Sequence, residues 1–261
     1  MTFYELYKKI DSDICPTSLS CEWDNDGIMC MPNPNREVKR VLISLDVTER
    51  IVDYAISNNF DTIISHHPLI FKSQNSMSVY NYTQRKLIKL IQNNINVMSF
   101  HTRLDAADGG VNDTLCKFLK LDKYVSKDEN DPVGRIASVW ELDDGKEEIS
   151  LDLFAEQVKQ YLSTHVVIYN GNNPVKRIYV CGGDGKDMIN NALLCGADTL
   201  LTGRASYNTI VDAEDMGLNI VEAGHFFTEH PICYTLRDIV NAYCKDAYVY
   251  VSEESPIKIL K

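Results

Sequence analysis

The chain has 261 residues, 44% of them hydrophobic, and a formal net charge of -11 at pH 7. A surface with this much negative charge repels the phosphates of nucleic acids, and we therefore expect no general nucleic-acid binding. No apolar run reaches the roughly 18 residues of a membrane span. Residues 1–16 also lack the basic start and apolar stretch of a secretory signal. We therefore expect a cytoplasmic protein with no membrane contact. The eight cysteines include no C-x-x-C pair, which excludes a zinc ribbon and favours reduced thiols.

In the first half of the chain, apolar and polar residues predict strands and helices in alternation. The predicted elements are a strand at 38–47, a helix at 48–59 with Thr48 as N-cap, a strand at 61–65, a helix at 83–94, a strand at 95–100 and a helix at 111–119. Polar residues separate the strand at 61–65 from the next helix.

The second half repeats this alternation. It predicts a helix at 150–163, strands at 165–170 and 175–183, a helix at 185–196 closed by Gly196, a strand at 197–203, a helix at 205–217, a strand at 219–225, a helix at 229–244 and a strand at 247–252. Such alternation is typical of the α/β class, with mixed sheets flanked by helices. We predict two α/β domains, 1–125 and 126–261. The boundary is approximate, and the C-terminal part is free to pack back on the first domain.

The two predicted domains look alike in sequence. VKRVLISLDVTERIVDYAISNNFDTIIS begins at Val38, and VKRIYVCGGDGKDMINNALLCGADTLLT begins at Val175, an offset of 137 without a gap. Any two strand–helix–strand units share apolar positions, but here identities fall on polar positions too. The match therefore indicates an internal duplication.

Each half continues to a strand that ends at a histidine, with a carboxylate four residues later. These pairs are His101 with Asp105, and His225 with Glu229. The C-terminal ends of strands are where sites form in open α/β sheets. A pseudo-twofold arrangement of the halves would bring both pairs to one cleft.

Five of the six histidines lie in three short segments around these strand ends; the sixth, His165, sits in an apolar strand and reads as structural. His66 and His67 follow a buried strand, and Pro68 holds His67 extended. Adjacent side chains of extended chain point opposite ways, so we expect this pair to serve two metals instead of chelating one. The alternative is a pair of polar turn residues.

The carboxylates also have ordinary explanations. Asp105 precedes a loop made tight by Gly109 and Gly110, where an aspartate caps a turn. Glu229 in the first turn of a helix compensates the helix dipole. Taken with the histidines, however, they form a mixed nitrogen and oxygen set that suits Zn, Fe, Mn or Co and disfavours Cu(I) and Ca.

Several motifs carry a family resemblance over nearly the whole chain. The segments WDNDG (23–27), SHHPLIF (65–71), HTRLDAADGGVNDTL (101–115), the TG of LLTGR (200–204) and GHFFTE (224–229) resemble the dinuclear metal centre family of GTP cyclohydrolase 1 type 2 homologues. The resemblance implies two divalent ions per chain, with at least one bridging carboxylate, and the ligands His66, His67, Asp105, His225 and Glu229. It also implies two related α/β domains around a metal cleft, a toroidal homo-hexamer, and His101 near the site.

Three residues depart from the family pattern as we expect it. Arg204 stands where an acidic residue follows TG, and Arg103 and Asp108 replace an asparagine and a proline. These changes spare the five ligands but alter the substrate pocket, because a cation in place of an acid changes which charge is favoured.

We expect a metal-dependent hydrolase in which two ions lower the pKa of a bridging water, with His101 as the acid–base partner. The resemblance implies a small, nucleotide-like substrate, although the chain has no P-loop. Arg103, Lys72 and Arg204 are candidates for phosphate contacts, or else solvent-exposed charges. Two alternatives use the same ligands: a metal-handling or regulatory protein with a closed site, and a scaffold in which metal ties the halves together.

Overall fold

A computed structural model describes residues 1–121, 125–139, 148–164 and 168–258. The predicted role of His165 lies outside these residues. The chain divides into two compact units, one formed by Met1–Asp108 with Ile232–Glu254, the other by Gly109–Pro231 with the residues from Ser255 on. Each unit contains a mixed β-sheet flanked by helices, which confirms the predicted α/β class.

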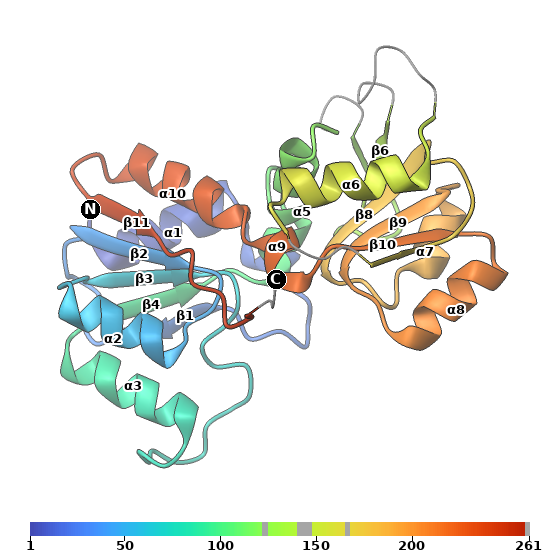
Figure 1. The fold of residues 1–261 in the computed structure, drawn as a ribbon. Helices are drawn as coiled ribbons and strands as arrows, with labels where there is room; N and C mark the ends of the chain where they lie inside the picture. The colour runs from blue at the N-terminus through green and yellow to red at the C-terminus, as the bar shows by residue number, and fades with distance from the viewer. Residues whose placement is uncertain (122–124, 140–147, 165–167, 259–261) are drawn as a thin grey trace. The chain divides into compact units, whose positions relative to one another are not determined.

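The sheet of the first unit has five strands in the order β1-β4-β3-β2-β11. They are β1 (Gly27–Cys30), β4 (Asn96–Ser99), β3 (Thr62–Ser65), β2 (Arg40–Ser44) and β11 (Tyr248–Val251). Only β1 runs antiparallel to its neighbour; the remaining neighbours are parallel. The helices are α1 (Phe3–Asp13), the 3-10 helix η1 (Thr17–Leu19), α2 (Glu49–Ser57), α3 (Tyr82–Gln92), α4 (Thr102–Ala106) and α10 (Ile232–Tyr243). Helices α2 and α3 cover one face of the sheet, and α1 and α10 the other (Figure 1).

The second unit has a six-stranded sheet in the order β5-β6-β8-β9-β10-β7. The strands are β5 (Ser126–Lys127), β6 (Arg135–Ser138), β7 (Ile168–Asn170), β8 (Arg177–Asp184), β9 (Thr199–Arg204) and β10 (Asn219–Glu222). One core packs α5 (Val111–Phe118) and α6 (Leu151–Tyr161) on the sheet. A second core packs α7 (Ile189–Leu194) and α8 (Tyr207–Asp215) on the opposite face, and the short α9 (His225–Glu229) follows β10.

The predicted strand at 219–225 ends earlier than expected. Strand β10 stops at Glu222, and His225 is the first residue of α9. Gly224, with φ +87°, makes the turn between them in a conformation that glycine adopts without strain.

The two units repeat one strand–helix–strand structure. In the first, β2 pairs with β3 in parallel so that Val41 faces Thr62; in the second, β8 pairs with β9 so that Ile178 faces Thr199. Both numbers of the second pair exceed those of the first by 137, the offset of the sequence match. The internal duplication therefore extends to the register of the sheets.

The matching polar residues explain why the sequence identity includes them. In each unit one aspartate accepts two backbone N–H groups at the start of the preceding strand, at 2.7–3.0 Å: Asp61 from Lys39 and Arg40, and Asp198 from Lys176 and Arg177. The threonine that follows donates its hydroxyl to the same carboxylate. These bonds satisfy backbone donors at the entrance of each parallel pair, so the aspartate and threonine are needed in both copies.

None of the eight cysteines, all of which the structure describes, forms a disulfide bond. Within the described ranges, no helix has the length and apolarity needed to cross a membrane.

Candidate metal centre

The strand β3 delivers His66 and His67 at its C-terminal end. All four residues of β3 are buried, and His66 itself is fully buried. Nδ1 of His66 donates to the backbone carbonyl of Phe100 at 2.9 Å. A carbonyl oxygen only accepts hydrogen bonds, so Nδ1 carries the proton and Nε2 keeps the lone pair that a metal requires.

His67 and His101 are held in the same way, but by carboxylates. Nδ1 of His67 lies 2.8 Å from Oδ1 of Asp46, and Nδ1 of His101 lies 2.9 Å from Oδ1 of Asp24. In both cases the carboxylate accepts from Nδ1 and leaves Nε2 for a ligand or a proton. Such a pairing of an imidazole with an oxygen acceptor commonly orients metal-binding histidines.

The three imidazoles of the first unit lie together. The ring centroids of His66 and His67 are 4.9 Å apart, and both rings are within 5.7 Å of His101. One nitrogen from each ring lies within 4.8 Å of the other two. The sequence predicted that His66 and His67 point opposite ways; this was wrong, because β3 ends at Ser65 and the chain turns there.

Asp105 joins this group from α4. Its Oδ1 lies 3.6 Å from Nε2 of His66. This is too long for a hydrogen bond. It fits two ligands of one cation, because metal–ligand bonds near 2.0–2.1 Å place neighbouring ligand atoms roughly 3–3.5 Å apart. The first unit thus gathers four of the six predicted site residues.

The second unit carries the other two on α9. His225 and Glu229 are one helical turn apart, with Nε2 of His225 at 2.9 Å from Oε2 of Glu229. Glu229 is buried. A mixed imidazole and carboxylate donor set of this kind fits Zn, Fe, Mn or Co.

Two glycines make room for α9. A Cβ on Gly183, which has φ +68°, would lie 2.1 Å from Oε1 of Glu229. A Cβ on Gly203 would lie 2.4 Å from Oγ1 of Thr228 and 2.8 Å from Cα of His225. The backbone N–H of Gly183 also donates to Oγ1 of Thr228. Gly183 near the end of β8 and Gly203 in the TG of β9 therefore make the space that the two candidate ligands occupy.

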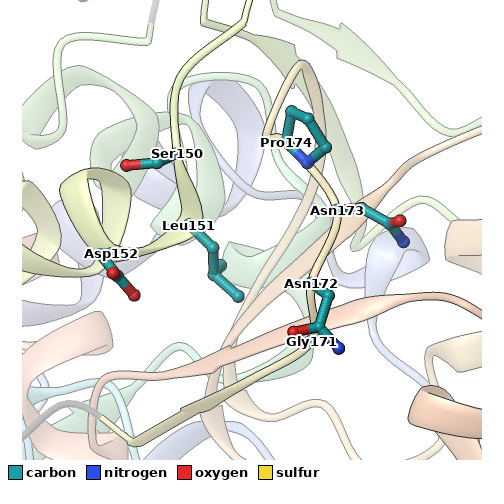
Figure 2. Close-up of a pocket in the computed structure, with 7 residues that line it drawn as sticks. All are labelled: Ser150, Leu151, Asp152, Gly171, Asn172, Asn173 and Pro174. Carbon is teal, nitrogen blue, oxygen red and sulfur yellow. The ribbon is translucent and has the colours of Figure 1, made fainter.

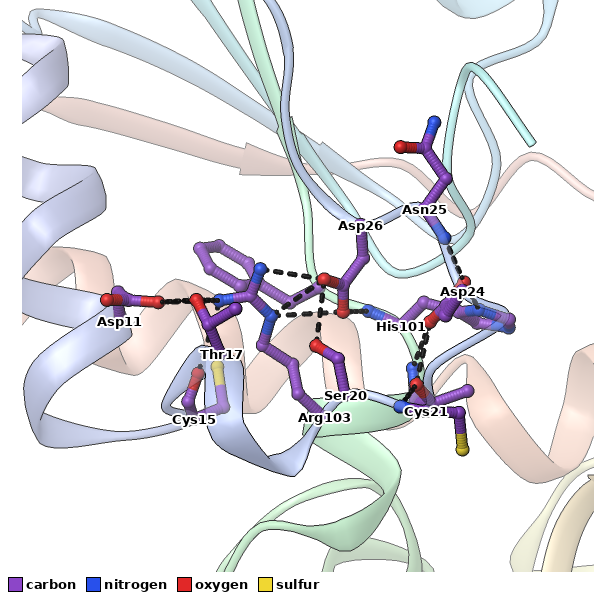
Figure 3. Close-up of polar contacts among 12 residues, drawn as sticks. Asp11, Cys15, Thr17, Ser20, Cys21, Asp24, Asn25, Asp26, His101 and Arg103 are labelled. Carbon is purple, nitrogen blue, oxygen red and sulfur yellow. Dashed lines mark hydrogen bonds and ion pairs between the residues drawn. The ribbon is translucent and has the colours of Figure 1, made fainter. Parts of the chain in front are cut away.

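Arg103 has a structural role that the sequence did not predict. It is 1% exposed and donates to both oxygens of Asp26 at 3.0 Å, and to Asp11 at 2.7 Å (Figure 3). Burial opposes its charge, but the carboxylate of Asp26 outweighs this effect and raises the pKa of Arg103 above its ordinary value. The prediction of a phosphate contact or an exposed charge at Arg103 was wrong; Lys72 and Arg204 are exposed.

Three carboxylates near the histidines were missed as functional residues. Asp24 and Asp46 orient imidazoles, and Oδ2 of Asp26 accepts the backbone N–H of His101 at 3.2 Å. The sequence did mark these three positions, since Asp46 follows the buried strand β2, and Asp24 and Asp26 belong to the WDNDG segment.

A cavity of about 280 Å³ in the second unit is separate from these residues. It is lined by Ser150–Asp152 and Gly171–Pro174, at the start of α6 (Figure 2). Its lining contains no histidine and none of the predicted ligands, so it is not part of the candidate metal centre.

Comparisons with known proteins identify the family of the chain. A family model described as Duf34/NIF3 (NGG1p interacting factor 3) matches residues 1–256. The chain belongs to the Duf34/NIF3 family. A curated relative from Clostridium perfringens, named GTP cyclohydrolase 1 type 2 homolog, is 32% identical over 249 residues and 94% of each chain. The resemblance drawn from the motifs is thereby confirmed.

The Duf34/NIF3 relationship extends to solved structures and to eukaryotes. The Staphylococcus aureus hypothetical protein SA1388 has a TM-score of 0.88 at 28% identity, covering 100% of this chain and 99% of that one. A protein named NIF3 homolog from Schizosaccharomyces pombe is 28% identical over 261 residues, covering 94% of this chain and 93% of its own. Both units of the chain therefore belong to the common Duf34/NIF3 fold.

Proposed function

We propose that this protein is a dinuclear-metal-dependent hydrolase acting on a small, nucleotide-like or phosphorylated substrate. One observation carries the proposal: three imidazoles of the first unit have Nδ1 fixed on an oxygen and present nitrogens within 4.8 Å of one another. Orienting three imidazoles together has no evident packing benefit, whereas a metal-dependent hydrolase needs such groups, two as ligands and one as an acid–base partner beside them.

In this proposal His66, His67 and Asp105 of the first unit and His225 and Glu229 of the second hold two divalent ions, Zn, Fe, Mn or Co. Ions held there would supply Lewis-acid chemistry, which would polarise the scissile group and lower the pKa of a water at the site. His101 is not a ligand here. It exchanges a proton with the reacting group at Nε2, since Asp24 holds Nδ1.

The substrate class follows from the relatives' names and the chain's own charges. Curated relatives from Clostridium perfringens and Clostridium acetobutylicum are named for GTP cyclohydrolase, whose substrate is a purine nucleotide. Lys72 and Arg204 are exposed and available to a phosphate. We propose a purine nucleotide as the first substrate to test, and a cytoplasmic homo-hexamer as the working form.

Metal analysis of the purified full chain, together with a hydrolysis panel of nucleotides and phosphomonoesters, tests the proposal. We expect two ions per chain, loss of at least one in Asp105→Ala, and loss of turnover with an intact fold in Glu229→Gln. Asp53→Ala is the matched control, because Asp53 is an exposed aspartate that pairs with Lys89 at the surface. It should keep both ions and full turnover.

Two results would overturn parts of this scheme. An Asp105→Ala variant that still holds two ions would refute the ligand assignment. Ready transfer of metal to an acceptor, with no turnover of any substrate, would establish a metal-handling role instead. Light scattering checks the assembly, which should have about six times the 29.6 kDa mass of the chain.

A further inference from the structure

Two large aromatic side chains of the first unit stand exposed beside His101. Trp23 is 65% exposed and Phe71 is 52% exposed. Their ring centroids are 6.2 Å apart, and each lies 6.2–6.3 Å from the ring of His101. Tryptophan and phenylalanine side chains usually contribute to cores or interfaces, so an exposed pair next to a candidate catalytic histidine calls for a function.

The chain fixes this pair through the residues next to it. Asp24, which follows Trp23, turns inward and accepts from the backbone N–H and the hydroxyl of Thr102, at 3.0 and 2.7 Å. Asn25 donates from Nδ2 to the backbone carbonyl of Ile70, the residue before Phe71. The two segments are therefore tied to each other and to α4, which fixes the backbone from which the two aromatic side chains extend.

We propose that Trp23 and Phe71 form the surface on which the planar heteroaromatic ring of the substrate stacks, beside His101. This inference rests on the proposed hydrolase function and specifies its substrate as a molecule with a flat ring. The two rings meet edge to face with an interplanar angle of 62°, so their faces do not cover each other. Stacking on such faces is available to any nucleobase, because every base has a π-face.

The size of the pair argues against a protein partner. Two aromatic side chains bury at most about 300–500 Å² in total, whereas a specific protein interface buries about 800 Å² on each partner. A single planar ring needs no more area than the pair offers. The position beside His101 also places the occupant next to the group that exchanges a proton in the proposed reaction.

Fluorescence of the full-length protein tests this assignment. Trp23 and Trp140 are the two tryptophans of the sequence, so Trp140→Phe leaves Trp23 as the only tryptophan reporter. In that background, GMP, AMP and UMP are titrated in parallel with ribose 5-phosphate, which has the phosphate and sugar but no base. We expect at least one nucleotide to quench Trp23 emission with saturation, and ribose 5-phosphate to leave it unchanged.

The variants then measure the contribution of stacking. Phe71→Ala should weaken binding of the quenching nucleotide by roughly 5- to 150-fold, the range that corresponds to the loss of one stacked base. Phe71→Tyr should restore it. Trp23→Ala should weaken binding by a similar factor in calorimetry. Tyr207→Ala, which removes an 80% exposed aromatic of the second unit, is the matched control and should bind normally.

Several outcomes would overturn the inference. Equal quenching by ribose 5-phosphate, no quenching by any of the three nucleotides, or unchanged affinity in both alanine variants would each do so. A changed molecular mass of the protein in those variants would instead assign the aromatic pair to contacts between copies of the chain. Metal content is measured on the same samples. Wild-type protein that holds no metal refutes the proposed function, whereas full metal occupancy with unchanged affinity in the alanine variants refutes only the stacking surface.

Discussion

Nδ1 of His101 lies 2.9 Å from Oδ1 of Asp24, whose side chain is completely buried. Burial raises the pKa of Asp24, but hydrogen bonds from His101 and Thr102 outweigh it and hold the pKa well below its ordinary value. The carboxylate is therefore ionised at every pH at which the protein is expected to work. An ionised carboxylate only accepts hydrogen bonds, so it keeps the proton of the neutral imidazole on Nδ1.

Removing this carboxylate should change the tautomer of His101. In metal-free protein at pH 8, where an ordinary histidine is neutral, NMR of the ring nitrogens should show His101 protonated on Nδ1. Asp24→Ala should shift the proton toward Nε2 and lower the free energy of unfolding by about 1–3 kcal/mol. Asp24→Asn keeps an acceptor oxygen and should preserve the tautomer. A spectrum of Asp24→Ala that matches wild type, with the signal assigned through His101→Gln, would show that Asp24 does not fix the ring.

The Arg103–Asp26 pair should be important for stability. Both side chains are at most 3% exposed. Removal of one partner leaves the other charge buried, which typically costs about 3–5 kcal/mol. We expect Arg103→Ala to lower the free energy of unfolding in urea by that amount. Arg237→Ala removes an arginine from an exposed pair with Asp238 and should change it by less than about 0.5 kcal/mol. Similar losses in both variants would mean that burial of the Arg103 pair has no special effect.

Gly183 and Gly196 form a matched pair for testing the seat of Glu229. Their φ angles are +68° and +67°, so alanine strains the backbone equally at both positions. Only at Gly183 would the new Cβ strike Oε1 of Glu229, since nothing lies within 4 Å of a Cβ on Gly196. Gly183→Ala should reduce metal occupancy, whereas Gly196→Ala should lose stability alone. Unaltered occupancy in Gly183→Ala, measured by metal analysis, would remove Glu229 from the ligand set.

A buried tyrosine–aspartate bond should make the second unit sensitive to acid. The hydroxyl of Tyr179 donates to Oδ2 of Asp128 at 2.8 Å. Burial raises the pKa of Asp128, but hydrogen bonds from Asn130 and Tyr179 outweigh it and leave the pKa below its ordinary value. The folded-state pKa lies below the unfolded one, so this stabilisation is complete above about pH 4 and is lost as pH falls through the lowered value.

Tyr179→Phe should therefore cost roughly 1.5–3 kcal/mol at pH 7 and clearly less at pH 3. Urea unfolding at the two pH values measures the difference. The exposed Tyr207→Phe should have no effect at either pH. If the cost of Tyr179→Phe were the same at both pH values, the bond would not depend on the ionised carboxylate.

Much of the fold could be predicted from local patterns. The strand–helix alternation and the repeat at offset 137 identified the α/β class, and the repeat appears as an identical register in the two sheets. The pairing of β11 with β2 could not be predicted from the sequence. The two strands are about 200 residues apart, and the alternation of apolar and polar residues in a strand does not specify its neighbour. The start of α9 was misplaced because Gly224 ends an apolar run that looks like a continuous strand.

Part of the candidate site could also be predicted from local sequence patterns. His66, Asp105 and His101 stand at or just after strand ends, which the pattern located. The WDNDG segment marked Asp24 but not its contact with His101, because the segment precedes the short β1, whose hydrogen bonds to β4 depend on residues about 70 positions away. Arg103 was assigned to the surface, since a lone arginine in a polar loop does not reveal that Asp26 and Asp11 enclose it.

The pairing of β11 with β2 has a consequence for synthesis of the protein. Residues Gly109–Pro231 of the second unit lie in sequence between the two parts of the first unit, so the last strand of the first sheet leaves the ribosome only after them. Until then, β2 is an open edge with unpaired backbone groups, which is a template for aggregation. A nascent chain that stalls before residue 248 exposes this edge, and it is the species that chaperones would have to protect.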